Sequence, residues 1–464
     1  AFADNSSSDW GTGSLVITNA ADNEVSFGTD ANGLTEDQVA QITIAGEAAV
    51  INTSGQISAI IISVSSFTNA GGDNLWSNAA NWSAGIPNVD TAKVTVDADL
   101  IVDSNKTVGQ IKTNNDSSAA SVTITATNNS VLTITGSGVT QPIQNNKSGG
   151  SFVFNLPVVF DSSEDATETL RFNSGADQSI TFSSSLTLND PLTVSGVNKN
   201  HDLNLDGSLL GSGDLILGAK TQANFGASYN GSSYAGTLTT AGGGGNTNNQ
   251  VTIISNVSDD GTFLKSGGLL NVTKDGAKIT VNGANTLKGN IAVGDYNPTL
   301  TVNKNQSAVG TITMGSGTLS LSLATAVTSV AFADNSSSDW GTGSLVITGA
   351  GVDEVSFGTS DSALTNDQLS QITIGGFSAT ISSTGKINSN NAPTAIDDVL
   401  TVDEDANLTS KDVIANDTDS DGNSLSVTAA TTAGSGTVAI NSNGVSIDYT
   451  CLLYTSDAAD EHSW

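Results

Sequence analysis

Short stretches of alternating apolar and polar residues recur along most of the chain, and most of them end at Asn, Gly, Ser or Asp. Alternation with a period of two predicts β-strands that bury one face, and the intervening turn residues predict tight corners. The clearest stretches are residues 94–96, 122–124, 132–134, 152–154, 203–205, 215–217, 251–253, 279–281, 311–313 and 319–321.

Strands this short, repeated between about residues 93 and 323, suit an all-β fold. We predict a right-handed parallel β-helix, a solenoid in which each coil stacks on the one before and buries a narrow core. Roughly 20 to 25 residues per coil would give about ten coils and a rod on the order of 50 Å long. The default role of such a rod is that of a spacer.

One segment of the chain is present twice. Residues 1–18, AFADNSSSDWGTGSLVIT, return unchanged as residues 331–348, and a looser match continues to Ile57 and Ile387 without a change of register. Such duplication is typical of proteins assembled from repeated structural units, and it is rare in a catalytic domain.

Within this duplicated unit, residues 14–18 and 24–27 are predicted to pair as a β-hairpin. Thr35 and Gln38 have the spacing of a capping box and predict one short helix. The second copy keeps the same pair while neighbouring positions change, which favours a requirement of the fold over a function.

Two tryptophans, Trp76 and Trp82, precede the predicted solenoid. They suit two alternative roles. A pair of exposed indoles can form a platform for a carbohydrate, whereas buried aromatic side chains can cover the open end of a solenoid. We favour the second role because terminal repeats need a cap.

Composition agrees with turn-rich β structure, since Gly is abundant at 49 residues and Pro is scarce at 6. The 46 Asp and Glu outnumber the 14 Lys and Arg, which gives a formal net charge of -32. Nucleic acids and anionic lipid surfaces would repel such a chain, so neither is expected as a partner. The sequence also lacks a stretch of roughly 18 apolar residues, and we expect no insertion into a membrane.

The solenoid region contains the motifs GSGDLIL at residues 211–217, SYAGTL at 233–238 and VNGANTL at 281–287. These motifs resemble the autotransporter-associated β-strand repeats of bacterial surface proteins. Residues 76–87 are similar to the opening segment of the same exported proteins, and the duplicated unit resembles their closing segment. The resemblance implies a secreted β-helical scaffold and no particular activity.

This resemblance also implies a layout. Residues 1–60 would close an upstream solenoid that is missing from a fragment, residues 61–330 would form the solenoid itself, and residues 331–387 would close it. Residues 388–450 would contain a linker and a partial β-sandwich. The last segment, 451–464, reads CLLYTSDAADEHSW and looks like translated sequencing-adapter read-through. It holds the sole cysteine, Cys451. We leave this segment out of the functional argument.

The partial β-sandwich is inferred from acidic motifs after the linker. Residues 392–398, 402–405 and 413–422 resemble the bacterial cadherin-like and immunoglobulin-like repeats of large adhesins. The resemblance implies a β-sandwich, often in tandem, with calcium bound at its acidic loops.

Calcium is also the natural ligand for Asp417-x-Asp419-x-Asp421-Gly422, because alternate carboxylates on one loop converge and Gly permits the turn. The loop is not an EF-hand, which would need Glu at the position of Thr428 and flanking helices. The alternative is a solvated turn whose Asp side chains accept hydrogen bonds from local backbone amides. The family resemblance adds Glu404 or Asp397 to the proposed ligands.

Residues for catalysis are few. His201 is predicted to be an isolated surface residue in a turn, and nothing places a nucleophile beside it. A β-helical polysaccharide lyase or hydrolase is the enzymatic alternative, but it would need a base or paired carboxylates, and Arg171 is the sole Arg. We therefore predict no enzymatic activity.

A third alternative is a scaffold whose flat Thr- and Asn-rich faces bind polysaccharide or ice. Thr-x-Thr stretches occur at 123–125, 133–135 and 311–313, although their spacing is irregular. The sequence best predicts a fragment of a long, acidic, exported bacterial surface protein, an adhesin or matrix component at the cell surface. Its partner would be a surface polysaccharide or protein.

Overall fold

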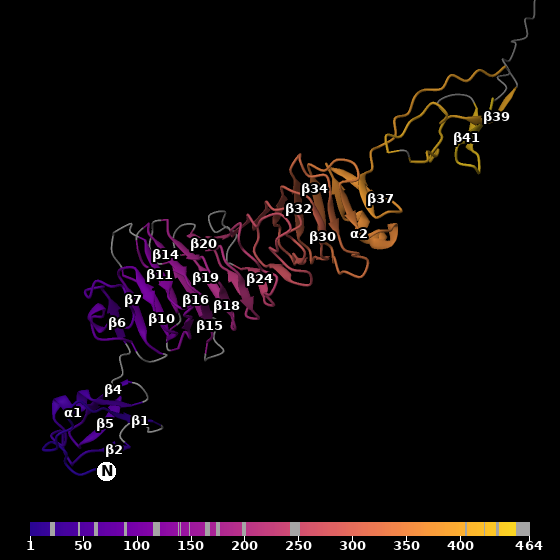
Figure 1. Ribbon diagram of the computed structural model, residues 1–464. Helices are drawn as coiled ribbons and strands as arrows, with labels where there is room; N and C mark the ends of the chain where they lie inside the picture. The colour runs from indigo at the N-terminus through magenta and orange to yellow at the C-terminus, as the bar shows by residue number, and fades with distance from the viewer. Residues whose placement is uncertain are drawn as a thin grey trace, which may run out of the picture.

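The computed structural model describes residues 1–18, 24–44, 47–59, 64–87, 91–114, 121–137, 139, 141–147, 149–162, 168–172, 177–196, 201–241, 251–403, 406–421, 423–432 and 436–451. The chain is almost entirely β, with about 4% helix. Along the sequence it forms an N-terminal unit, a long β-solenoid that ends in a closing unit, and a C-terminal segment (Figure 1).

The solenoid is a stack of parallel strands in about 12 turns. In its first half each coil contributes three strands, one to each of three faces, and every strand pairs in parallel with the strand one coil earlier. For example, Ile111 lies beside Val94 on one face and Leu132 lies beside Lys106 on another. The predicted β-solenoid is therefore confirmed.

The first face is an 11-stranded sheet. Its strands are β6 (Val64–Phe67), β7 (Lys93–Val96), β10 (Gln110–Thr113), β13 (Ile143–Asn145), β16 (Glu168–Phe172), β19 (Leu192–Ser195), β22 (Leu215–Leu217), β24 (Thr237–Thr240), β26 (Leu269–Val272), β28 (Asn290–Ala292) and β31 (Ile312–Thr313).

The second face runs beside it along the solenoid. Its strands are β8 (Leu100–Val102), β11 (Val122–Ala126), β14 (Ser151–Asn155), β17 (Ser179–Phe182), β20 (His201–Leu205), β23 (Thr221–Phe225), β25 (Thr252–Ser255), β27 (Lys278–Val281), β29 (Thr299–Val302) and β32 (Thr318–Leu323).

The third face is less regular. It begins with β9 (Lys106–Val108), β12 (Leu132–Ile134), β15 (Val158–Phe160), β18 (Leu186–Leu188) and β21 (Leu209–Gly211). It continues through single bridges that join Ser208, Asn230 and Thr262. Near the closing unit, β30 (Gln306–Val309) and β33 (Val330–Phe332) restore paired strands on this side.

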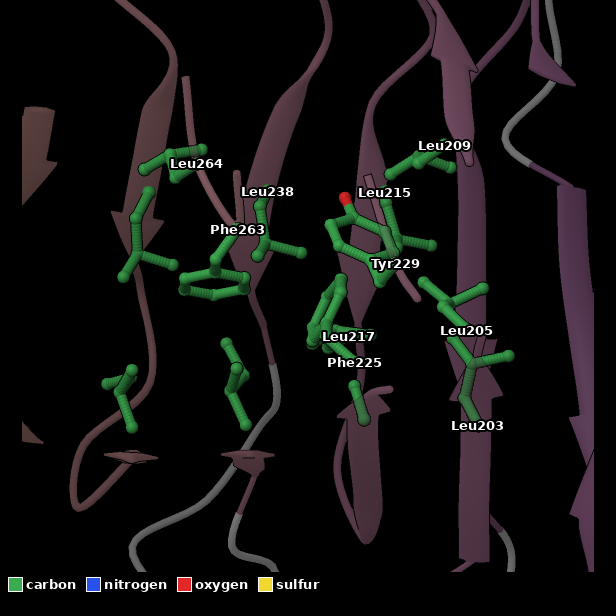
Figure 2. Packing of buried hydrophobic residues seen from close by; sticks show 14 of the residues in the cluster. Leu203, Leu205, Leu209, Leu215, Leu217, Phe225, Tyr229, Leu238, Phe263 and Leu264 are labelled. Atoms are coloured by element: carbon green, nitrogen blue, oxygen red, sulfur yellow. The ribbon is translucent and has the colours of Figure 1, made fainter. Parts of the chain in front are cut away.

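The core lies between the faces and is built by every second residue of each strand. The pattern in β20, β22 and β32 is strict, because each apolar side chain that points inward is almost fully buried. Figure 2 shows Leu, Phe and Tyr side chains of successive coils stacked in this narrow space. Phe225 packs edge-on against both Tyr229 and Phe263, with ring centroids 4.7 and 4.9 Å away. The predicted inward and outward alternation is confirmed.

The two tryptophans at the start of the solenoid are part of this core. Trp76 is fully buried and Trp82 is 6% exposed, and their ring centroids lie 4.9 Å apart. The indole Nε1–H of Trp82 donates to the carbonyl oxygen of Trp76 at 2.7 Å. Their burial fits the predicted cap, and neither of these two indoles is exposed as a carbohydrate platform would require.

The closing unit ends the parallel stacking. It contains β33, β34 (Ser344–Thr348), β35 (Val355–Phe357), α2 (Asn366–Ser370), β36 (Ile372–Ile374), β37 (Phe377–Ile381) and β38 (Lys386–Ser389). β34 pairs in parallel with β32 and β36, after which β37 and β38 turn back as antiparallel strands.

The N-terminal unit repeats the internal arrangement of the closing unit. It contains β1 (Leu15–Ile17), β2 (Val25–Ser26), α1 (Glu36–Ala40), β3 (Ile42–Ile44), β4 (Glu47–Ile51) and β5 (Gln56–Ala59). Both short helices have the predicted capping box, so that prediction is confirmed.

The predicted hairpin in the duplicated unit is wrong. β1 pairs in parallel with β3, whereas β2 pairs with β5, and the closing unit repeats this arrangement. The first strand is a solenoid strand whose partners lie one coil away, so its neighbour in sequence belongs to another face.

Within its described residues, the C-terminal segment has three antiparallel strands: β39 (Asn407–Asp412), β40 (Thr437–Ile440) and β41 (Ser446–Thr450). β41 pairs with both of the others. Large apolar side chains before β39 are exposed, among them Val399 at 91%.

Candidate functional site

The acidic loop lies against the linker that leaves the closing unit. Thr418, within the loop, forms an antiparallel bridge with Thr394 of the linker, and the two residues exchange N–H to carbonyl hydrogen bonds of 2.7 and 3.1 Å. This bridge holds residues 417–421 beside residues 390–396, so the loop is part of the junction between the solenoid and the C-terminal segment.

All three loop carboxylates accept hydrogen bonds from backbone amides. Asp417 Oδ1 accepts the N–H of Ile396 at 2.8 Å. Asp419 Oδ1 accepts the N–H of Asp421 at 2.8 Å and that of Asn423 at 3.3 Å. The contacts of Asp419 are the ones expected of an acidic turn that satisfies its own backbone, whereas Asp417 accepts an amide of the linker.

Asp421 connects the loop to the linker. Its carboxylate accepts the backbone N–H of Asn391 through Oδ2 and the Nδ2–H of the same residue at 2.9 Å through Oδ1. Beside it, Asn423 Nδ2 donates to Asn390 Oδ1 at 2.8 Å. Asp421 and Asn423 also line a hollow together with Ile374 and Ile381 of the closing unit. The loop therefore contacts the strip of chain that joins the two parts.

Of the other predicted ligands, Asp397 lies next to the loop through its backbone, and Glu404 is not described. The Asp397 side chain is exposed, and its backbone carbonyl oxygen lies 3.5 Å from Asn416 Nδ2. Glu404 and Gly422 lie outside the described residues. In the part of the chain that the structure describes, no three His, Cys, Asp or Glu side chains gather in a set that could hold a metal ion. Calcium at this loop stays a prediction.

Sequence reasoning missed Asn390 and Asn391, which were assigned only to a polar linker. Their polar side chains contact the acidic loop and its flank. No local sequence signal could have found this role, because residues 390–391 precede the loop by about 26 residues and meet it only in the folded chain.

The C-terminal part of the chain is similar to a known family. Residues 390–462 match the bacterial Ig domain. This Ig domain begins at the linker asparagines and includes the candidate loop and all three antiparallel strands. It also includes residues 451–462, most of the tail interpreted as adapter read-through, and that interpretation is not confirmed. No curated protein and no solved structure matches the chain.

The prediction that His201 is a surface residue is wrong. His201 begins β20, is fully buried, and stacks on Phe172 with the ring centroids 4.8 Å apart and the planes 9° from parallel. The imidazole is therefore part of the packed core of the solenoid. Arg171 lies on the outward side of β16 between Gln144 and Ser195 of the adjacent strands.

Regular Thr rows would favour the ice- or polysaccharide-binding alternative. On the second face, the row that starts at Thr123 continues with Val153, Thr181, Asn204 and Asn224. Further on, the same row meets Ile254 before Thr280. The apolar interruptions make this row an irregular surface.

Many Asp and Asn side chains at the corners join one coil to the next. Asp295 Oδ1 accepts both the N–H and the hydroxyl of Ser316, at 2.8 and 2.9 Å. Asp259 accepts the N–H of Ala284 and forms an ion pair with Lys304 at 2.9 Å. These contacts lower the pKa of both carboxyl groups, with the backbone hydrogen bond as the main cause in each. Part of the acidic composition is thus used to hold the stack together.

Across the described ranges, no helix is long and apolar enough to cross a membrane.

Proposed function

We propose that this chain is part of an extracellular scaffold of a bacterial cell surface or matrix, with a mechanical and adhesive role and no catalytic one. The observation that carries the proposal is the order of its parts: a β-solenoid of about 12 turns with a closing unit, followed directly by a bacterial Ig domain. Bacterial Ig domains are typical of extracellular or surface proteins. The solenoid would act as a spacer that projects the Ig domain.

The finer form of this proposal is an adhesin built from autotransporter-type repeats that binds a surface polysaccharide or protein. It rests on the motif resemblance at residues 211–217, 233–238 and 281–287. Depolymerisation of a polysaccharide by the full chain would contradict the non-catalytic role.

We further propose that calcium stiffens the junction between the solenoid and the Ig domain. Support comes from the loop carboxylates, which lie along the linker and already contact it through Asp421. A calcium ion would neutralise neighbouring carboxylates and add oxygen ligands from both sides of the junction. Its removal would loosen the junction and leave the solenoid intact.

Calorimetric unfolding of the full chain with and without millimolar calcium tests this. We expect one transition to rise with calcium, by about 1.4 kcal/mol when calcium is tenfold above its dissociation constant. The double variant Asp419→Ala, Asp421→Ala should lose this rise. Asp9→Ala is the matched control, because Asp9 also accepts one local backbone N–H, that of Gly11 at 2.8 Å, in the N-terminal unit. A scan that is identical with and without calcium would refute the calcium proposal alone.

A further inference from the structure

The two copies of the duplicated unit have the same internal structure. In each, the stacked Phe pair has nearly the same geometry: the ring centroids of Phe2 and Phe27 lie 4.9 Å apart, and those of Phe332 and Phe357 lie 5.0 Å apart. The Nε2 of Gln38 donates to two carbonyl oxygens of its own unit, as does that of Gln368. The two copies differ in their surroundings.

The closing unit is covered on one face by the last coil of the solenoid. Five residues of β34 pair in parallel with β32, from Ser344 beside Thr318 to Thr348 beside Ser322. Two side chains reach across to the adjacent strand β31 of that coil. Trp340 Nε1–H donates to the carbonyl oxygen of Ile312 at 3.0 Å, and Asn335 Oδ1 accepts the N–H of the same residue at 2.7 Å.

The same face of the N-terminal unit is uncovered among the described residues. Of the strands that the structure describes, β1 pairs with β3 only, which makes it an edge strand. Phe2 is 58% exposed, whereas its counterpart Phe332 is 3% exposed. Leu15 and Ile17 are partly exposed, although Leu345 and Ile347 are fully buried. Trp10 is also partly exposed and lines a shallow hollow with Gly13, Ser14 and Leu15.

The backbone of β1 is oriented to pair with a further strand. The N–H of Leu15 donates to the carbonyl of Gln41 on the β3 side at 3.0 Å. In a parallel ladder the amides of alternate residues point to opposite neighbours, so those of Ser14 and Val16 point to the uncovered side. The counterpart of Ser14, Ser344, donates its N–H to Gly317 of the covering coil at 3.0 Å. An apolar edge strand of this kind is a template for another strand.

We propose that the N-terminal unit is a docking surface for the last coil of a second β-solenoid, which directly precedes Ala1 on the same polypeptide. The coil would pair in parallel with β1, cover Phe2 and Leu15, and offer a carbonyl oxygen to Trp10. The way the chain enters the closing unit favours a solenoid on the same polypeptide as the partner of this surface. In the closing unit, β33 begins at Val330, one residue before Ala331, so the corresponding strand would enter the N-terminal unit from the residue before Ala1. This inference is independent of calcium and of adhesion.

A second copy of the chain is a poorer occupant. The face accepts the last coil of a solenoid, and the last coil in this chain is already paired with β34 through five residues. A copy in solution would have to displace a closing unit that is attached to its own solenoid.

The test joins an additional copy of residues 64–330 directly to Ala1 of the full chain. Because residues 1–18 equal residues 331–348, this recreates the junction found at residue 330. Hydrogen exchange is measured on peptides that run past residue 19, where the two copies differ in sequence. We expect the amides of Ser14 and Val16 to exchange at least about tenfold more slowly in the joined chain. Slow exchange of β34 in the same chain reports that the solenoid has folded.

The control is the same joined chain with Ser320→Pro in the added solenoid, which should remove the protection by disrupting the strand that pairs with β1. If exchange at Ser14 and Val16 is unchanged by the added solenoid, the proposal is wrong. Sedimentation of the original chain at rising concentration gives an independent result. A monomer is expected. Association that Phe2→Asp abolishes would identify a second copy as the occupant and overturn the proposal.

Discussion

Tyr234 places a hydroxyl group inside the solenoid, where it both accepts and donates a hydrogen bond. Its hydroxyl accepts the N–H of Leu215 at 2.8 Å and donates to the carbonyl oxygen of Gly213 at 2.8 Å. Burial raises the pKa of Tyr234, and also that of Tyr229 in the same part of the core. Both phenols therefore stay neutral in ordinary buffers, and Tyr234 acts as a hydrogen-bonding bridge to the preceding coil.

Replacement Tyr234→Phe should lower the free energy of unfolding by about 1–3 kcal/mol, because a buried N–H and a buried carbonyl lose their partner. Chemical denaturation measures the change. Tyr296→Phe is the control, since Tyr296 is 36% exposed, and it should have little effect. Equal effects of the two variants would contradict the bridging role.

The folded chain destabilises the charged form of the Asp202 carboxyl group. Desolvation raises its pKa, and the nearby charge of Asp177 adds to the effect. A carboxyl group whose pKa is raised on folding contributes stability below its unfolded pKa and loses it as pH rises through the folded value.

Accordingly, Asp202→Asn should raise the melting temperature at pH 7, and the difference from the parent chain should shrink as pH falls toward 3.8, the ordinary pKa of an Asp side chain. Differential scanning calorimetry at several pH values measures it. A variant that is less stable at neutral pH would show that the charged carboxylate has a favourable partner.

At this scale the sequence predicted the polarity of strands better than the role of single residues. His201, Leu203 and Leu205 have the same parity in β20, so alternation placed His201 inward. The prediction placed His201 on the surface because His is usually exposed. Its position in the strand instead turns the side chain into the core. Asp421 was identified as a candidate ligand, but its contact with Asn391 depends on tertiary structure.

At the level of elements, each short helix of the duplicated unit holds an earlier segment of its own unit through a Gln side chain. The side chain of Gln368 caps its helix and reaches the carbonyl oxygens of Asn335 and Ser338, at 2.7 and 2.8 Å. One side chain thus joins the helix to the segment that meets the last coil.

Gln368→Ala should lower stability by about 1–3 kcal/mol, because these buried partners are left unsatisfied. Hydrogen exchange should show faster opening at the end of the solenoid. Gln38→Ala removes the matched contacts in the N-terminal unit and should accelerate exchange there while leaving the solenoid unchanged. Acceleration of exchange in β32 by Gln38→Ala would contradict the independence of the two units.

The carboxylates at the corners of the coils should change stability with pH in the opposite direction to Asp202, because folding lowers their pKa. Hydrogen bonds from Ser316 lower the pKa of Asp295, so its contribution is present above the ordinary Asp pKa of 3.8 and is lost as pH falls through the folded value. Asp295→Ala should therefore lower the melting temperature at pH 7 and have little effect below its folded pKa. Thermal scans of both chains across this range measure the loss. A difference that persists in acid would assign the effect to packing.

Local patterns predicted the strands but not every partner. Residues 14–18 and 24–27 of the duplicated unit are close in sequence and both alternate, which favoured a hairpin. Pairing of β34 with β32 covers five residues and buries Leu345 and Ile347 in the core. That gain depends on a strand more than twenty residues earlier, which a short window of sequence does not include.

For the whole molecule, the sequence predicted the solenoid and underestimated its length, about ten coils against about 12. The estimate covered only residues 93–323, whereas parallel pairing begins at β6 and continues into β34. Two strands that the sequence did not predict also have few apolar residues. β9 reads Lys-Thr-Val and β13 reads Ile-Gln-Asn, so each lacks the repeated alternation seen in β32. Their position is set by pairing with the coils before and after, which only the assembled stack supplies.

The closing unit has a consequence for how such molecules behave when crowded together. Every strand from β33 to β38 pairs with a neighbour on both sides, since the antiparallel strands β37 and β38 return across the end of the stack. Unpaired edge strands are where β-proteins add further chains and grow into fibrils. This end of the solenoid offers no such edge among the described residues, so solenoids held at high density can stand side by side without polymerising through it.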